Sequence, residues 1–149
     1  MSAAPAPRAE TLYTPAVLAL ATALAAHPLT GDLPLQGAAR SPACGSSLQL
    51  GLALDGQGGI DRIGMTARAC AIGQAAAALF AQGARGRSAT EIAEAAEEID
   101  RWLDGAAPLP GWPGLAAIAP ARDFPGRHGA VRLAWRAALD ALSPQSTPG

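Results

Sequence analysis

The segment from residue 48 to residue 66 constrains the fold of this chain more than any other part of its sequence. Every second residue from 48 to 54 is leucine, with small or polar residues between, and this period of two is typical of a half-buried strand. Residues 55–59 (DGQGG) are a dense turn signal, and apolar residues alternate again over 60–66. The pattern predicts an antiparallel hairpin.

Helical periodicity dominates the rest of the chain. Thr14 followed by Pro15 is typical of a helix start, and Ser88 with Glu91 has the spacing of a capping box. Helices are predicted at residues 15–26, 71–83, 88–104, 113–118 and 127–142, a short edge strand at 33–35, and a loop at 38–45.

This order of elements predicts an α+β fold, in which a small antiparallel sheet of two to three strands packs against four to five helices. The length of 149 residues fits one domain. We expect that domain to span residues 14–142, with a flexible N-terminal segment at 1–13 and a flexible tail at 143–149. Trp102, Trp112 and Trp135 are predicted to lie in or at the edge of its core.

Composition excludes several functional classes. The net charge is -1 and the chain has no lysine, so nothing draws it electrostatically to nucleic acid or to an anionic membrane. The apolar run at residues 16–26 is too short to cross a bilayer, which needs about 20 residues. Two cysteines are too few for a secreted disulfide scaffold of this size. We therefore expect a cytoplasmic protein whose cysteines are thiols.

The positions of Cys44 and Cys70 indicate where chemistry could occur. Cys44 lies in the loop that leads into the first strand of the hairpin, and Cys70 lies where the second strand leads into a helix. The hairpin would therefore bring both thiols to one end of the sheet. A helix start with Arg68 nearby is an electropositive setting, typical of reactive cysteines, and paired thiolates suit a soft metal or sulfur. The alternative is that both are small buried hydrophobic residues.

Three segments in order resemble the U-type iron-sulfur scaffold family, which comprises IscU, SufU and the NifU N-terminal domains. Residues 41–46 (SPACGS) are similar to the family's x-P-x-C-G-D loop. Residues 64–75 (GMTARACAIGQA) are similar to its G-x-G-C-x-I-S-x-A-S junction between strand and helix. Residues 124–139 (FPGRHGAVRLAWRAAL) are similar to F-P-x-R-x-x-C-x-x-L-x-W-x-A-L. The resemblance covers nearly the whole chain, and the long stretch after Cys70 is similar to the SufU branch.

The resemblance implies a scaffold that accepts sulfur from a cysteine desulfurase and assembles or relays an iron-sulfur cluster. The family's site uses three cysteines and one aspartate, and in several members it holds zinc. Cys44 and Cys70 match two of these ligands. Ser46 stands at the aspartate position and Ala130 at the third cysteine position, while His128 lies two residues before Ala130 and does not align with a ligand.

From the sequence we expect a non-enzymatic scaffold that binds iron or an iron-sulfur cluster, with zinc as a further candidate, through Cys44 and Cys70. His128, an outside ligand or a second subunit of a homodimer would complete the ligand set. The expected partners are a cysteine desulfurase and apo-protein acceptors. Two alternatives remain: a persulfide carrier that needs only one nucleophilic thiolate, and a metal-free interaction module on the same fold.

Overall fold

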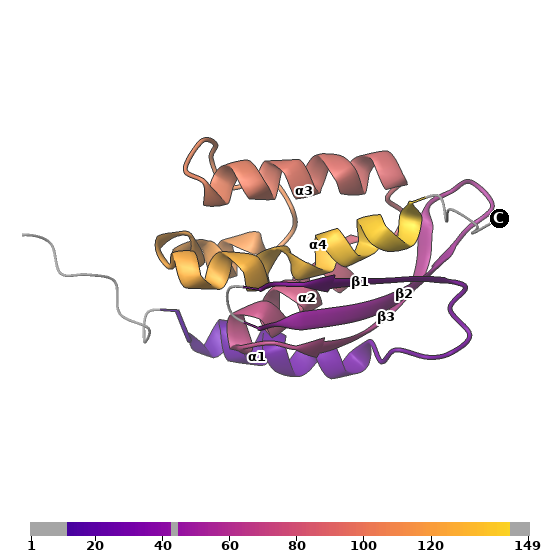
Figure 1. The fold of residues 1–149 in the computed structure, drawn as a ribbon, viewed down its shortest axis with the longest axis horizontal. Helices are drawn as coiled ribbons and strands as arrows, with labels where there is room; N and C mark the ends of the chain where they lie inside the picture. Colours follow the sequence, from indigo (N-terminus) through magenta and orange to yellow (C-terminus); the bar gives the residue numbers. More distant parts are fainter. Residues whose placement is uncertain (1–11, 43–44, 144–149) are drawn as a thin grey trace, which may run out of the picture.

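The computed structural model describes residues 12–42 and 45–143, and its architecture is the predicted α+β type (Figure 1). A three-stranded antiparallel sheet in the order β1-β2-β3 packs one face against helices. In chain order the elements are α1 (Pro15–Ala23), η2 (Leu24–Ala26), β1 (Leu35–Arg40), β2 (Ser47–Leu54), β3 (Ile60–Arg68), α2 (Ala71–Gly83), α3 (Ala89–Leu103), η3 (Leu115–Asp123), η4 (Pro125–Arg127) and α4 (His128–Leu142), where η denotes a 3₁₀ helix. Within the described ranges, no helix combines the length and the apolar character needed to cross a bilayer.

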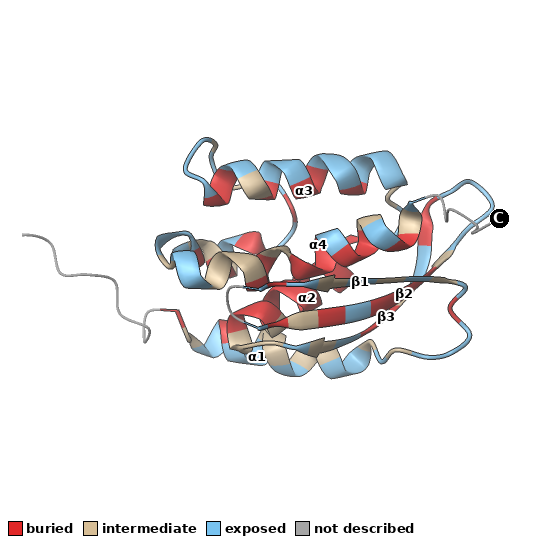
Figure 2. Cartoon of the chain, viewed as in Figure 1, coloured by how far each residue is buried: buried red, intermediate tan, exposed pale blue. Residues whose placement is uncertain are grey.

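The predicted hairpin is confirmed as β2 and β3. Its register pairs Leu50 with Met65 and Leu52 with Ile63 across the two strands. Leu48, Leu50 and Leu52 all point toward the helices, and none of them is more than 1% exposed. Along β2 in Figure 2 the period of two seen in the sequence holds from Ser47 to Leu50, but Gly51 is also buried, under Leu33, and Leu54 is exposed.

Strand β1 differs from the prediction, which placed a short strand at 33–35 and a loop at 38–45. The strand begins at Leu35 and pairs with β2 along its whole length to Arg40. Leu33 instead lies across the sheet, where its side chain occupies the space that a Cβ at Gly51 or Gly64 would need. Residues 35–40 (LQGAAR) have no apolar alternation, so their extended form depends on pairing with β2 and was not visible in the sequence.

Helix α4 approaches β1 closely because β1 has a glycine at the contact. A Cβ at Gly37 would lie 2.2 Å from the Ala137 carbonyl oxygen and 2.5 Å from the Ala141 nitrogen. The side chain of Asp140 on α4 also accepts a hydrogen bond of 2.9 Å from the Ala38 N–H. On the opposite edge, the Met65 N–H of β3 donates to the His27 carbonyl at 2.8 Å. Both contacts cover edge groups that could otherwise pair with another chain.

An aromatic cluster joins α2, α4 and the loop after α3. Phe80 stacks on Trp112 with ring centroids 5.6 Å apart, and Trp135 meets both rings edge-on. The Trp112 indole N–H donates to the Leu79 carbonyl at 2.8 Å, and the Arg87 guanidinium lies 4.2 Å from the Trp112 ring centroid. All three tryptophans are buried, which confirms the prediction for them.

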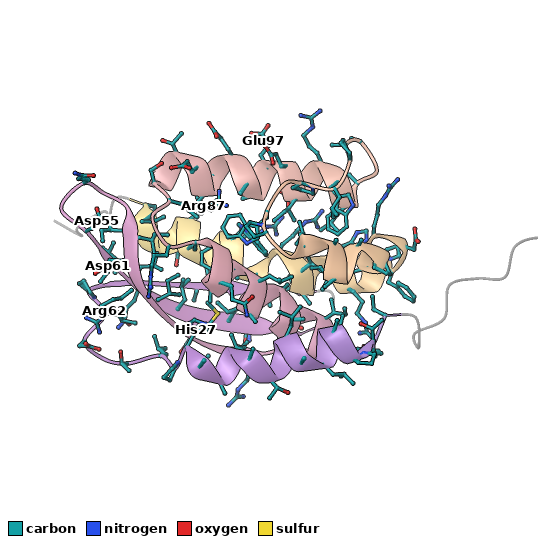
Figure 3. All side chains as sticks on the ribbon, turned by 180° about the vertical axis from the view of Figure 1, so that it is seen from behind. His27, Asp55, Asp61, Arg62, Arg87 and Glu97 are labelled. Carbon is teal, nitrogen blue, oxygen red and sulfur yellow. The ribbon has the colours of Figure 1, made fainter. Side chains whose placement is uncertain are left out.

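Helix α3 begins at the predicted capping box. The Ser88 hydroxyl accepts from the Glu91 N–H, and the Glu91 carboxylate accepts from the Ser88 N–H, each at 3.2 Å. Its apolar face packs inward, whereas acidic residues such as Glu97 point to solvent (Figure 3). Arg132 of α4 bridges to Asp100 at 2.8 Å, which ties α3 to α4.

The stretch predicted as a short helix at 113–118 is a longer 3₁₀ helix, η3. It starts after Gly114, which has a φ of 79°, and it continues through Pro120 to Asp123. Proline has no N–H to donate, so residue 120 weakens a regular α-helix at this point. The tighter 3₁₀ geometry is the local solution.

Candidate functional site

Strand ends and helix starts meet at one end of the sheet. The register places Arg40 of β1 beside Ser47 of β2, and Ser47 beside Arg68 of β3. Because Cys70 follows Arg68 by two residues, the cysteine lies just beyond this row. This is the end of the sheet where the sequence predicted the site.

Cys70 is the N-cap residue of α2. Its backbone is extended, with φ -64° and ψ 171°, and its carbonyl accepts the first helical hydrogen bond from the Gln74 N–H at 3.0 Å. The side-chain amide of Gln74 donates a hydrogen bond of 3.0 Å to the Ala69 carbonyl, which holds the junction between β3 and α2. The Cys70 thiol is free and makes no capping hydrogen bond, and the residue is partly buried against the hydrophobic core. It lies at a helix N-terminus, where the macrodipole favours negative charge.

The start of α4 comes to the same place through contacts between small residues. A Cβ at Gly129 would lie 2.0 Å from the Ser41 Oγ, so the loop after β1 rests on α4. A Cβ at Gly73 of α2 would lie 3.1 Å from the Ala130 Cβ. The loop at Ser41, the start of α2 and the start of α4 therefore meet at one end of the sheet.

Ser46 and Ala130, which the sequence resemblance aligns with two family ligands, are both buried. Ser46 is 6% exposed and Ala130 is 1% exposed. The loop that contains Ser46 is closed by hydrogen bonds from the Ser41 N–H to the Ser46 carbonyl at 2.8 Å and from the Gly45 N–H to the Ser41 carbonyl at 2.9 Å. Both residues are thus buried near this end of the sheet, and neither is a soft-metal ligand.

His128, proposed from the sequence as an extra ligand, is the first residue of α4 and is partly buried. Its Nε2 lies 2.8 Å from the Arg122 carbonyl oxygen, within hydrogen-bonding distance. As a donor to this oxygen, Nε2 would leave only Nδ1 for a metal. A ligand role for His128 stays a prediction.

Cys44 lies outside the described residues, so the predicted proximity of Cys44 and Cys70 stays a prediction. Among the residues that are described, no three or more histidines, cysteines, aspartates and glutamates come together as a potential metal site.

Sequence reasoning missed the row formed by Arg40, Ser47 and Arg68. Arg40 was placed in a loop, and its position opposite Ser47 follows only from the pairing of β1 with β2. The extra length of β3, which runs to Arg68 rather than to residue 66, completes the row. No local pattern links Arg40 to Arg68, because only the pairing of the three strands brings them into one row.

Comparison by sequence finds no matching protein-family model and no matching curated protein. Comparison by structure finds several similar folds. One is the N-terminal part of a nitrogen-fixing NifU-like protein from Brucella abortus, with a TM-score of 0.81 and 24% identity, covering 90% of this chain and 94% of that one. Another is a putative iron-sulfur cluster assembly scaffold protein for the SUF system from Fervidobacterium islandicum AW-1, with a TM-score of 0.80 and 18% identity, covering 91% of this chain and 100% of that one.

A third similar structure is a hypothetical protein, with a TM-score of 0.64 and 20% identity, covering 84% of this chain and 95% of that one. The two more similar matches extend over 90% and 91% of this chain. This chain therefore has the α+β fold of the NifU N-terminal-like and SufU iron-sulfur scaffold structures.

Proposed function

We propose that this protein is an iron-sulfur cluster assembly scaffold that binds iron or a cluster through Cys44 and Cys70. The observation that carries the proposal is the position of Cys70, a partly exposed thiol at the start of α2, on a scaffold fold. The starts of α2 and α4 and the loop at Ser41 support one another there. This arrangement can hold a thiolate at a defined point and still leave it accessible.

The cluster is the cargo of such a protein, and the number of thiolates it needs determines how many chains must bind it. A two-iron, two-sulfur cluster takes four thiolates, whereas this chain has two cysteines. Two chains related by a two-fold axis would supply four. We therefore propose that a stably held cluster is shared by a homodimer, and that a monomer would need ligands from a partner or a small thiol.

A persulfide carrier is the second candidate, favoured by the partial exposure of the Cys70 thiol. In that reaction the Cys70 thiolate attacks the terminal sulfur of a persulfide on a cysteine desulfurase. The sulfur–sulfur bond breaks, its electron pair stays on the enzyme's cysteine as a thiolate, and the persulfide is now on Cys70. Nothing is oxidised or reduced overall, and one thiolate is sufficient.

The proposed partners are a cysteine desulfurase, which supplies sulfur, and apo-proteins, which receive the cluster. We place both exchanges in the cytoplasm, because a reducing compartment keeps the two cysteines as thiols. In this role the protein supplies ligands and a docking surface rather than catalysis.

The test is anaerobic purification and reconstitution with iron, cysteine and a desulfurase, followed by analysis of iron, zinc and acid-labile sulfide per chain. Wild-type protein should retain iron and sulfide, and Cys70→Ser should lose both. A matched control is the double variant Cys70→Ser with Ser143→Cys, which restores the number of thiols on the exposed residue after α4. If this control binds as well as wild type, the thiols bind metal adventitiously and the proposal is wrong.

Sedimentation and mass spectrometry together separate the cluster scaffold from the persulfide carrier. A shared cluster predicts that the cluster absorbance sediments with a dimer, and a coloured monomer without retained thiol would contradict it. For the carrier, mass spectrometry after incubation with a desulfurase and cysteine should show one added sulfur atom on Cys70, with no iron needed. A chain that acquires neither iron nor sulfur would instead be a metal-free interaction module.

A further inference from the structure

The outer face of the sheet, which turns away from the helices, has polar and positively charged residues that the proposed function does not use. Because Leu48 and Leu50 point inward, the alternating positions Ser47 and Gln49 point outward. In Figure 1 helix α2 is seen behind the sheet, so this outer face is turned toward the viewer. Gln49 pairs with Ala38 on one side and with Thr66 on the other.

Arg40, Ser47 and Arg68 form one row across the outer face at the end near Cys70. Both arginines are exposed, and they lie on β1 and β3, the two strands that flank Ser47 on β2. Over residues 12–42 and 45–143, no carboxylate lies within ion-pair distance of either guanidinium. Two positive charges are therefore held on one side of the sheet without a counter-charge from these residues.

A hollow of about 570 Å³ adjoins this row. Its lining includes Ala39 and Leu48, whose side chains belong to the inner face of the sheet, and otherwise consists of small or polar residues: Ala38, Arg40, Ser47, Gln49, Thr66 and Arg68. Farther along the same face the side chain of Leu33 covers Gly51 and Gly64. The loop before β1 therefore covers that part of the outer face, and the hollow lies at the end with Arg40 and Arg68. The volume is within the range of about 300–1,000 Å³ that is typical of small-molecule sites.

At the opposite end of the same face, an arginine is paired with a carboxylate of the same chain. Arg62, on the same face of β3, pairs with Asp32, which also accepts a hydrogen bond from Thr30. Figure 3 shows Arg62 near Asp61 and Asp55 at the turn end of the hairpin. Six residues of strand separate Arg62 from Arg68, about 20 Å, so Arg62 is a natural control for Arg68.

We propose that Arg40, Ser47 and Arg68 form a binding site for a small polyanion, recognised through its carboxylate or phosphate oxygens. Guanidinium groups are donors suited to both kinds of oxyanion. Ser47, Gln49 and Thr66 offer hydroxyl and amide groups for the uncharged part of the ligand. The site does not depend on the proposed iron-sulfur function, because it contains neither cysteine.

The test is isothermal titration calorimetry of the metal-free full-length chain with citrate and, separately, with pyrophosphate. One ion should bind per chain, and affinity should fall as salt is added. Arg40→Gln and Arg68→Gln should each weaken binding about tenfold or more, since each removes a charge-assisted contact. Arg62→Gln should change nothing, because it lies beyond the Debye length of about 8 Å at physiological salt.

Two further measurements make the outcome decisive. Chemical-shift changes in the wild-type protein should centre on the amides of Ala38, Gln49 and Thr66, which does not depend on the folding of any variant. Cys70→Ser should bind the anion normally even if it loses iron, so the two proposals fail independently. Saturable binding of citrate alone identifies a carboxylate ligand, and of pyrophosphate alone a phosphate ligand. Saturable binding of neither ion, or equal weakening by Arg62→Gln, overturns the proposal.

Discussion

The two ends of the sheet use polar residues in opposite ways. At the turn end, Asp55 accepts hydrogen bonds from the N–H groups of Gln57 at 2.8 Å and Gly59 at 3.0 Å, and Arg62 pairs with Asp32. At the cysteine end, Arg40 and Arg68 are exposed and Cys70 is a partly buried free thiol. At the turn end Asp55 and Arg62 are thus paired within the chain, whereas Arg40 and Arg68 have no ion-pair partner among the described residues.

This comparison predicts that turn-end residues build the fold and that cysteine-end residues serve the proposed binding. Turn-end substitutions should change stability and leave binding intact. Cysteine-end substitutions should change binding, except where they disturb the close packing of Ser41, Gly73, Gly129 and Ala130. The predictions below test that division, starting with the largest expected effect.

Restoring the family ligands should convert the cysteine end into a complete single-chain site. A full structural zinc site contributes about 10–16 kcal/mol of binding, so each of four ligands is worth roughly 3 kcal/mol, or about 100-fold in affinity. Ser46→Asp with Ala130→Cys should therefore raise zinc affinity by several orders of magnitude and favour a metal-bound monomer. Competition with a zinc chelator measures this.

Each single variant serves as the control for the pair and should give a smaller gain. Ala130 is buried beside Gly73, so the added sulfur is expected to cost about 1–3 kcal/mol of stability. An unchanged zinc affinity in a folded double variant would mean that Ala130 does not occupy a ligand position.

Gly129→Ala should loosen the cysteine end, because its Cβ would lie 2.0 Å from the Ser41 Oγ and 2.9 Å from the Ser41 Cβ. We expect a loss of about 1–3 kcal/mol in the free energy of unfolding, measured with urea. A double-mutant cycle with Ser41→Ala should show part of that loss recovered. Strictly additive effects would mean that the loop does not rest on α4 in solution. Gly126→Ala, where the added Cβ meets nothing within 4 Å, is the matched control.

Asp55→Ala should destabilise the turn by about 0.5–2 kcal/mol, the range for losing a side-chain cap on backbone N–H groups. Its two hydrogen bonds hold Gln57 and Gly59, and the Asp55 N–H also donates to the Gly59 carbonyl at 2.8 Å. Iron and anion binding should be unchanged in the folded protein. A binding defect at matched folded fraction would show that the two ends are coupled.

The smallest effect concerns the pH dependence of Asp32. Hydrogen bonds from Thr30 and then from Arg62 lower the pKa of the Asp32 carboxyl from 3.8 to about 2. A carboxyl with a lowered pKa in the folded state stabilises that state above pH 3.8, and this contribution is lost as pH falls toward 2. The effect should be small and salt-sensitive, because the pair is exposed.

An NMR titration of the Asp32 carboxyl carbon should show the lowered midpoint. The difference in urea midpoint between wild type and Asp32→Asn should shrink between pH 4 and pH 2. A midpoint near the ordinary value of 3.8 would mean that the Thr30 and Arg62 contacts do not persist in solution.

Local signals account for the elements that the sequence predicted well. The hairpin, the capping box of α3 and the end of α3 near Gly105, whose φ is 80°, each depend on a few neighbouring residues. Hydrophobic periodicity likewise placed α2 and α4 within one residue of their observed bounds. In such cases the residues that determine the element are contained within it or beside it.

The elements that were mispredicted depend on distant partners. Residues 35–40 form a strand because β2 supplies hydrogen bonds and because Gly37 lets α4 approach. Leu33 looked like part of that strand from its neighbours, but it packs across Gly51 and Gly64 instead. Neither contact leaves a periodic pattern in the sequence.

For the site, the sequence alone predicted which residues carry the chemistry: Cys44 and Cys70, at two connections expected to meet at one end of the hairpin, within motifs similar to a scaffold family. Only the tertiary structure placed Ser41 against Gly129, aligned Arg40 with Arg68 through Ser47, and brought the Nε2 of His128 to the Arg122 carbonyl. The physical reason is range: residue type and local period are properties of short segments, whereas close packing and strand register arise only when segments far apart in the chain compete for the same space.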